Sequence, residues 1–102
     1  MKILTSELEN QFPRLYETGG KTPSEVRIIA KFFDPCSSWS WYATEFDPID
    51  RLFFGLVRGF EAEIGYFSLD ELESYKGPLG LGIERDLYFG EHTLAEALEK
   101  AI

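Results

Sequence analysis

The sequence has very little of the side-chain chemistry on which metal and nucleophile sites usually depend. It contains one cysteine, Cys36, and one histidine, His92, in 102 residues. A single cysteine excludes an intramolecular disulfide framework, and one Cys with one His cannot supply the roughly four ligands of a structural zinc site. A Cys36–His92 nucleophile pair stays open as an alternative, and it requires a turn between strands to meet the start of the last helix.

Long apolar runs are also missing. No stretch approaches the roughly eighteen apolar residues of a membrane span, and the short apolar segment after Met1 cannot serve as the core of a signal peptide. Small secreted domains often depend on disulfides, so the scarcity of cysteine indicates a reducing compartment. We therefore expect a cytoplasmic protein without a membrane partner.

Positively charged residues are outnumbered. The 10 Lys and Arg stand against 18 Asp and Glu, which gives a formal net charge of −8. This excess opposes contact with phosphate backbones, whose affinity for proteins depends largely on Lys and Arg, so nucleic acid is not an expected partner. Two interpretations of the acidity stay open: solubility, or a surface that meets a basic protein.

Two glycine-rich segments lack the context of nucleotide-binding loops. The run at 19–22 resembles the end of a phosphate-binding loop, but Leu15 stands where that loop needs its first glycine. The run at 77–82 follows an expected helix instead of a strand, so it does not fit the dinucleotide-binding pattern. We interpret both segments as turns and expect no cofactor.

The residues that are present favour one mixed domain spanning residues 1–102, because 44% hydrophobic and 16% aromatic residues suffice for a core. Alternation with period two predicts strands at 25–33, 39–46 and 60–67, and the run at 52–58 gives a further strand. Capping boxes predict helices that start at Ser6, Ser68 and Thr93. We therefore expect an α+β domain with a four-stranded antiparallel meander sheet and about three short helices packed at its ends and faces.

Several aromatic and glycine-containing strings are distinctive as a set. They are Lys31-Phe32-Phe33, Trp39-Ser40-Trp41-Tyr42, Phe54-Gly55-Leu56-Val57, Gly59-Phe60-Glu61, Pro78-Leu79-Gly80 and Ile83-Glu84-Arg85-Asp86-Leu87-Tyr88-Phe89. Over roughly residues 15–89 the chain resembles the family catalogued as domain of unknown function 2958. The resemblance implies a small bacterial protein of the kind carried by plasmids, phages and other mobile elements. It implies no catalytic residues.

The aromatic side chains supply the first candidate site. Alternation places Trp39 and Trp41 on one face of the second strand, and Tyr42 and Phe46 on the other. Most of these rings must form core, but short helices cover two faces only partly, and an exposed aromatic patch often marks a binding site. Stacking rings on a sheet are also typical of single-stranded nucleic-acid binders, which need a basic groove that this chain lacks.

Carboxylates supply the second candidate site. Glu61 and Glu63 share the face of the fourth strand that is expected to be solvated, Asp47 opens a turn, and Glu45 approaches from a neighbouring strand. Such a group could hold a hard divalent cation or act as general acid and base. Arg85, between apolar flanks, either pairs with a carboxylate or contacts a ligand.

Our leading interpretation therefore assigns no catalytic residue and no metal ligand. The predicted function is a non-enzymatic protein-interaction module that acts through an acidic, aromatic-bearing surface, with a basic protein as its partner. The expected binding residues are Trp39, Trp41, Tyr42, Glu45, Asp47, Glu61, Glu63 and Arg85. The alternative is a carboxylate-based enzyme, with or without a divalent metal.

Overall fold

The computed structural model describes residues 2–102, so Met1 of the expected domain lies outside the described part. Three α-helices are present in it: α1 (Ser6–Glu9), α2 (Leu69–Ser74) and α3 (Leu94–Glu99). The 3-10 turns are η1 (Pro23–Glu25) and η2 (Pro78–Gly80). The strands are β1 (Arg27–Ile28), β2 (Ala30–Phe33), β3 (Ser40–Asp47), β4 (Leu52–Arg58), β5 (Ala62–Ser68), β6 (Glu84–Arg85) and β7 (His92–Thr93). Within these residues no helix is long and apolar enough to cross a bilayer.

The main sheet has five strands in the order β5-β4-β3-β2-β6, and every neighbouring pair is antiparallel. Strands β2 to β5 form the expected meander, but the prediction of four strands was wrong. The missing strand, β6, has only two residues and carries no alternation that a sequence pattern could detect. It pairs with β2, whose outer edge would otherwise leave main-chain groups unpaired.

The predicted strand at 25–33 is divided in the structure. Its first part, β1, pairs with β7 in a separate two-stranded sheet, and its second part, β2, enters the main sheet. Between them Ile29 donates its N–H to the Ala43 carbonyl oxygen at 2.9 Å. The chain therefore keeps its extended form while it changes partner, which periodicity alone does not reveal.

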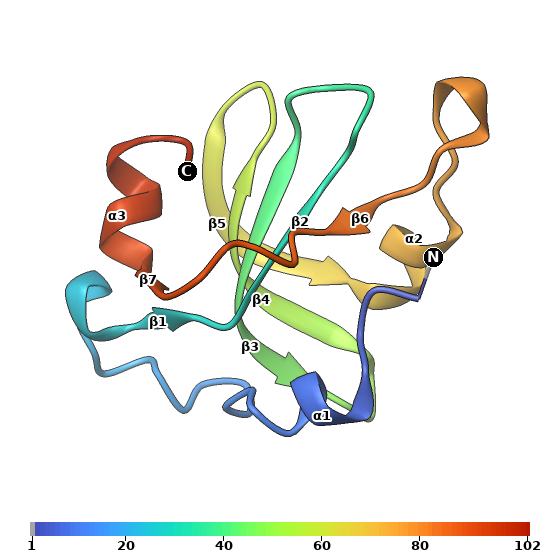
Figure 1. The fold of residues 1–102 in the computed structure, drawn as a ribbon. Helices are drawn as coiled ribbons and strands as arrows, with labels where there is room; N and C mark the ends of the chain where they lie inside the picture. The colour runs from blue at the N-terminus through green and yellow to red at the C-terminus, as the bar shows by residue number, and fades with distance from the viewer. Residues whose placement is uncertain (1) are drawn as a thin grey trace.

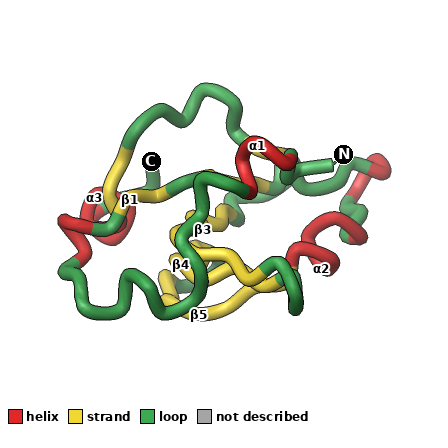
Figure 2. Tube along the Cα trace, turned by 90° about the horizontal axis from the view of Figure 1, so that it is seen from below, coloured by secondary structure: helices red, strands yellow, loops and turns green. Residues whose placement is uncertain are grey.

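Helices cover the two faces of the sheet from opposite sides (Figures 1 and 2). On one face, Leu69 and Leu72 of α2 join a cluster of phenylalanines in which Phe46 and Phe53 lie 4.7 Å apart between ring centroids. On the other face, α3 packs over Tyr42 and Leu56 and places Leu94 and Ala97 against them. The α2 face carries the candidate site.

A β-bulge in β3 reverses one predicted orientation. Ala43 pairs with Gly55, and Glu45 pairs with Phe54, so Thr44 is an extra residue in the ladder. Phe46 therefore shares the α2 face with Ala43 and belongs to the same cluster, not to the face of Tyr42 as alternation predicted.

The edge strand β5 also differs from the expectation. Its predicted buried face carries Ile64 and Tyr66, which are 50% and 51% exposed. The helix on that side, α3, packs mainly over β3 and β4. Both faces of the strand are therefore open over most of its length.

The helix starts follow the predicted caps closely. Ser68 accepts the N–H of Glu71 at the start of α2, and a full capping box joins Thr93 to Glu96 at α3. At α1 the cap is Thr5 instead of Ser6, because the Thr5 hydroxyl accepts the N–H of Leu8. The helix therefore begins one residue earlier in the chain than expected.

Candidate functional site

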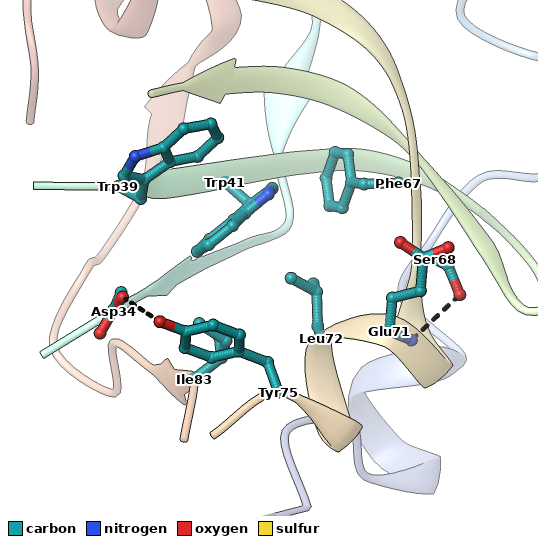
Figure 3. A pocket seen from close by; sticks show the side chains of 9 residues that line it. All are labelled: Asp34, Trp39, Trp41, Phe67, Ser68, Glu71, Leu72, Tyr75 and Ile83. Atoms are coloured by element: carbon teal, nitrogen blue, oxygen red, sulfur yellow. Dashed lines mark hydrogen bonds between the residues drawn. The ribbon is translucent and has the colours of Figure 1, made fainter. Parts of the chain in front are cut away.

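A hollow of about 340 Å³ lies between the sheet and α2 (Figure 3). Trp41 of β3 and Phe67 of β5 form its sheet side. Leu72 of α2 and Tyr75, the residue that caps the C-terminus of α2, also line the hollow. The short α2 covers Phe67 but stops before the tryptophans, so the space beside them is left open.

Trp39 lines both this hollow and a second one of about 490 Å³, which lies over β4 and β5. Its ring lies against Gly59, where a Cβ would come within 2.4 Å of the indole. It also lies 6.0 Å from Trp41 between ring centroids and meets Phe60 edge to face at 5.6 Å. Phe60 itself is 96% exposed, so large apolar surface faces solvent here. We refer to the two neighbouring hollows together as the tryptophan groove.

The tryptophan groove is acidic. Asp34 and Glu71 line the first hollow, and Glu61 and Glu63 line the second. No Lys, Arg or His stands among the described residues that line either one. The groove therefore joins aromatic surface to four carboxylates without a lining cation.

Asp34 is the most enclosed of these carboxylates, with 7% of its surface exposed. Its Oδ1 accepts the Cys36 N–H at 2.9 Å, and its Oδ2 accepts the hydroxyls of Ser37 and Tyr75 at 3.0 and 3.3 Å. All three donors are neutral. Burial raises the pKa of Tyr75 above its ordinary value, and the charge of Asp34 adds to this effect. The Tyr75 hydroxyl therefore remains a donor to the carboxylate.

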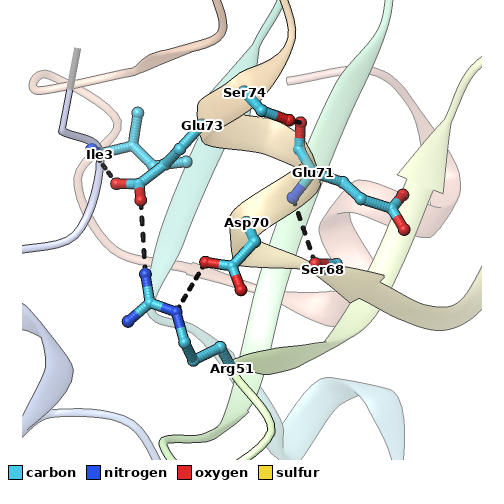
Figure 4. A network of polar contacts seen from close by, with 7 residues as sticks. All are labelled: Ile3, Arg51, Ser68, Asp70, Glu71, Glu73 and Ser74. Atoms are coloured by element: carbon cyan, nitrogen blue, oxygen red, sulfur yellow. Dashed lines mark hydrogen bonds and ion pairs between the residues drawn. The ribbon is translucent and has the colours of Figure 1, made fainter.

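Glu71 belongs to a helix whose other acids are already paired (Figure 4). Arg51 donates to Asp70 at 2.7 Å and to Glu73 at 3.5 Å. Glu73 also accepts the N–H of Ile3, which ties the N-terminal segment to α2. Glu71 points away from Arg51 and toward the groove, so this part of the helix adds negative charge there.

Of the predicted binding residues, Trp39, Trp41, Glu61 and Glu63 come together in the groove. The other four lie elsewhere. Arg85 stands in β6 beside α1, in a different surface hollow, and no ion pair joins it to a carboxylate within residues 2–102.

Tyr42 and Glu45 are core residues of the α3 face. Tyr42 has no exposed surface, and its hydroxyl donates to the main-chain oxygen of Ile102 at 2.9 Å and accepts the Ile102 N–H. Glu45 is 3% exposed and accepts the N–H of Tyr16 at 2.8 Å, the N–H of Thr18 at 2.9 Å and the Thr18 hydroxyl. Each side chain therefore fastens a terminal or loop segment to the sheet.

The four carboxylates of the enzyme alternative do not converge. Asp47 closes a turn by accepting the Ile49 N–H, and it lies about 17 Å along the sheet from Glu63, at about 3.3 Å per residue over five positions of β4. Glu45 and Glu63 point to opposite faces, because their partners on β4 are three residues apart. Among residues 2–102 no group of three or more His, Cys, Asp or Glu side chains is placed to hold a metal ion.

The Cys36 and His92 side chains of the nucleophile-pair alternative also lie apart in the structure. The Cys36 thiol lies 3.6 Å from the Pro78 carbonyl oxygen. The His92 ring contacts Glu96 through Nδ1 at 2.7 Å, beside α3 on the other face. The hydrogen bond from His92 lowers the pKa of Glu96, and the cap contacts with Thr93 lower it further.

Sequence reasoning missed Asp34, Glu71 and Tyr75. Asp34 and Tyr75 are 41 positions apart, and they meet only because α2 folds back over the sheet. The one available signal was the turn at 34–38, where an Asp followed by Pro and Ser is typical of a side chain that accepts main-chain N–H groups.

Comparison with known proteins gives one match. Residues 3–102 match the model of the family described as "Protein of unknown function (DUF2958)". No curated protein and no solved structure matches the chain.

Proposed function

The chain belongs to the DUF2958 family, and we propose that it is a non-enzymatic protein-interaction module that binds a basic partner protein through the tryptophan groove. One observation carries the proposal. Half-buried tryptophan rings, the exposed Phe60 and four carboxylates line neighbouring hollows, and no cation lines them among the described residues.

The chemistry of this surface suits protein recognition. Buried aromatic side chains contribute much of the binding energy in protein interfaces, and Trp and Tyr give large contact area with few rotatable bonds. Carboxylates around such a centre attract a basic partner and raise the association rate at low ionic strength. In this proposal, contacts with Trp39, Trp41 and Phe60 supply most of the affinity for the partner protein. The charges of Glu61 and Glu63 attract the basic partner.

The proposed cellular setting rests on the sequence. In this proposal the module acts in the cytoplasm, where a lone exposed cysteine stays reduced. The expected association of the family with mobile elements supports a protein of the host cell as the proposed partner class.

The test uses a defined basic probe, the peptide (Arg-Ala-Leu)₄, titrated into ¹⁵N-labelled protein. We expect amide shifts that concentrate on the groove, at Trp39, Val57, Glu63 and their neighbours. Binding should weaken as salt rises, because exposed charges are screened. The double substitution Glu61→Gln/Glu63→Gln should weaken binding several-fold.

The matched control removes the same charge elsewhere. Glu7→Gln/Glu99→Gln changes one exposed residue in α1 and one in α3 and should leave the affinity nearly unchanged. Equal weakening by both double variants, or shifts spread evenly over the surface, would mean that net charge alone attracts the peptide, and the proposal would fail.

A further inference from the structure

We propose that the hollow between Trp39, Trp41 and Tyr75 is a binding site for the guanidinium group of an arginine side chain on the partner protein, with Asp34 as its acceptor. This inference rests on the proposed function and adds the side chain that the groove recognises.

The first argument is the charge of Asp34. Its carboxylate is largely removed from water, yet its donors are an amide and two hydroxyls, and no cation lies within ion-pair distance among residues 2–102. Enclosed carboxylates are generally paired with a cation. The residue lines an open hollow, so a ligand can supply the missing positive charge.

The second argument is hydrogen-bond capacity. An ionised carboxylate offers about four acceptor positions, and Asp34 uses three. The fourth is on Oδ1, which accepts only the Cys36 N–H. An N–H of an entering cation can take that position without displacing a native contact.

The third argument is the shape of the walls. Two indole rings and a phenol ring surround the space beside the carboxylate, as the close-up shows (Figure 3). A guanidinium is planar and weakly hydrated, so it can stack on a ring face while its edge donates to a carboxylate. An ammonium group is more strongly hydrated and presents no flat face, so the same walls suit it less well.

The fourth argument is the position of Glu71. This carboxylate lines the same hollow, and it lies outside the contacts that Arg51 makes with Asp70 and Glu73. A cation in the hollow therefore has a second negative charge nearby, which adds attraction that decreases with salt.

The test measures binding of N-acetyl-arginine amide to ¹⁵N-labelled protein through the two indole N–H signals of the chain. We expect both signals to shift, with a dissociation constant on the order of a millimolar for so small a ligand. N-acetyl-citrulline amide has nearly the same shape without the charge, and we expect it to cause no saturable shift. N-acetyl-lysine amide should bind at least about fivefold more weakly.

Variants assign the contacts. Asp34→Asn and Glu71→Gln should each weaken arginine binding, by about tenfold and about threefold, since charged hydrogen bonds are the stronger class. Glu99→Gln on α3 is the matched control and should have no effect. Loss of amide dispersion would show that Asp34→Asn does not fold. In that case Glu71→Gln and Tyr75→Phe test the site. Glu71→Gln should weaken arginine binding, whereas Tyr75→Phe keeps the ring and should retain most of the binding.

The outcomes separate this inference from the proposed function. Equal binding of citrulline or lysine, or unchanged arginine binding in folded Asp34→Asn and Glu71→Gln, overturns the guanidinium site. If (Arg-Ala-Leu)₄ still binds and still depends on Glu61 and Glu63, the groove remains the interface. If neither probe binds, both proposals fail.

Discussion

Two glycines that face each other across the sheet should respond in opposite ways to the same substitution. Gly55 of β4 pairs with Gly65 of β5. A Cβ on Gly55 would lie 1.9 Å from the Tyr42 carbonyl oxygen and 3.2 Å from the Ala43 Cα, whereas a Cβ on Gly65 would meet no atom within 4 Å. The bulge at Thr44 brings the β3 main chain this close to Gly55 and requires a residue without a side chain there.

The magnitude follows from what has to move. The obstacle to Gly55→Ala is main chain, so no rotamer change relieves it, and the β3–β4 ladder must separate locally. Overpacking costs about 1–3 kcal/mol and occasionally more, so we expect a loss of at least about 3 kcal/mol in the free energy of unfolding. Gly65→Ala should instead be neutral or stabilising by up to about 1 kcal/mol, because alanine loses less conformational entropy on folding.

The assay is urea unfolding followed by tryptophan fluorescence, with thermal unfolding as a second measurement. For a domain of this size 1 kcal/mol corresponds to roughly 4–8 °C in Tm. Gly55→Ala should therefore lower Tm by about 12 °C or more, and Gly65→Ala should leave it unchanged or raise it slightly. If the two variants lose equal stability, the contact between the bulge and Gly55 does not exist as described.

Three further predictions concern side chains with buried or shielded partners. Glu45→Gln should lower the free energy of unfolding by about 1–3 kcal/mol and speed amide exchange in the loop at 16–18, because one acceptor oxygen becomes a donor that faces an N–H. Tyr42→Phe should cost about 1–2 kcal/mol and loosen the segment at Ile102, measured by urea unfolding and amide exchange. Tyr75 should ionise above its ordinary pKa of about 10 because of burial and the charge of Asp34. Its contribution to stability is therefore present below pH 10 and is lost as the pH rises toward the raised value; absorbance at 295 nm should follow the ionisation, and Asp34→Asn should lower the pKa of Tyr75.

Local signals predicted the parts of the fold that depend on local physics. The strand expected at 52–58 is β4 with the same limits, because a short apolar run bounded by turn residues is typical of a strand. The caps at Ser68 and Thr93 were found because a hydroxyl followed three residues later by Glu satisfies free N–H groups at a helix start.

Features set by partner strands could not be predicted in the same way. The bulge at Thr44 exists only in relation to β4, and the sole hint was a glycine, Gly55, inside a strand pattern. The strand β6 is defined by its pairing with β2 and not by its own two residues. Both results depend on contacts between distant segments.

The same distinction applies to the candidate site. Trp39 and Trp41 were predicted to share a face, and they do, because they precede the bulge. Glu45 follows the bulge, so its carboxylate turns to the opposite face and fastens a loop. One inserted residue therefore separates the aromatic candidates from one of the acidic ones.

The positions of several cations show where part of the net charge of −8 is concentrated. Arg51 is paired with acids on the far side of α2, and Arg58 donates to the last carbonyls of α3 at 2.6–3.2 Å. Lys31 donates to the main chain at the C-terminus from the α3 face. None of these three cations lines the groove, whose charged lining residues are all carboxylates. The excess negative charge therefore includes four carboxylates on one hollowed surface, and a basic side chain of a partner should be attracted to Asp34 and Glu71 there.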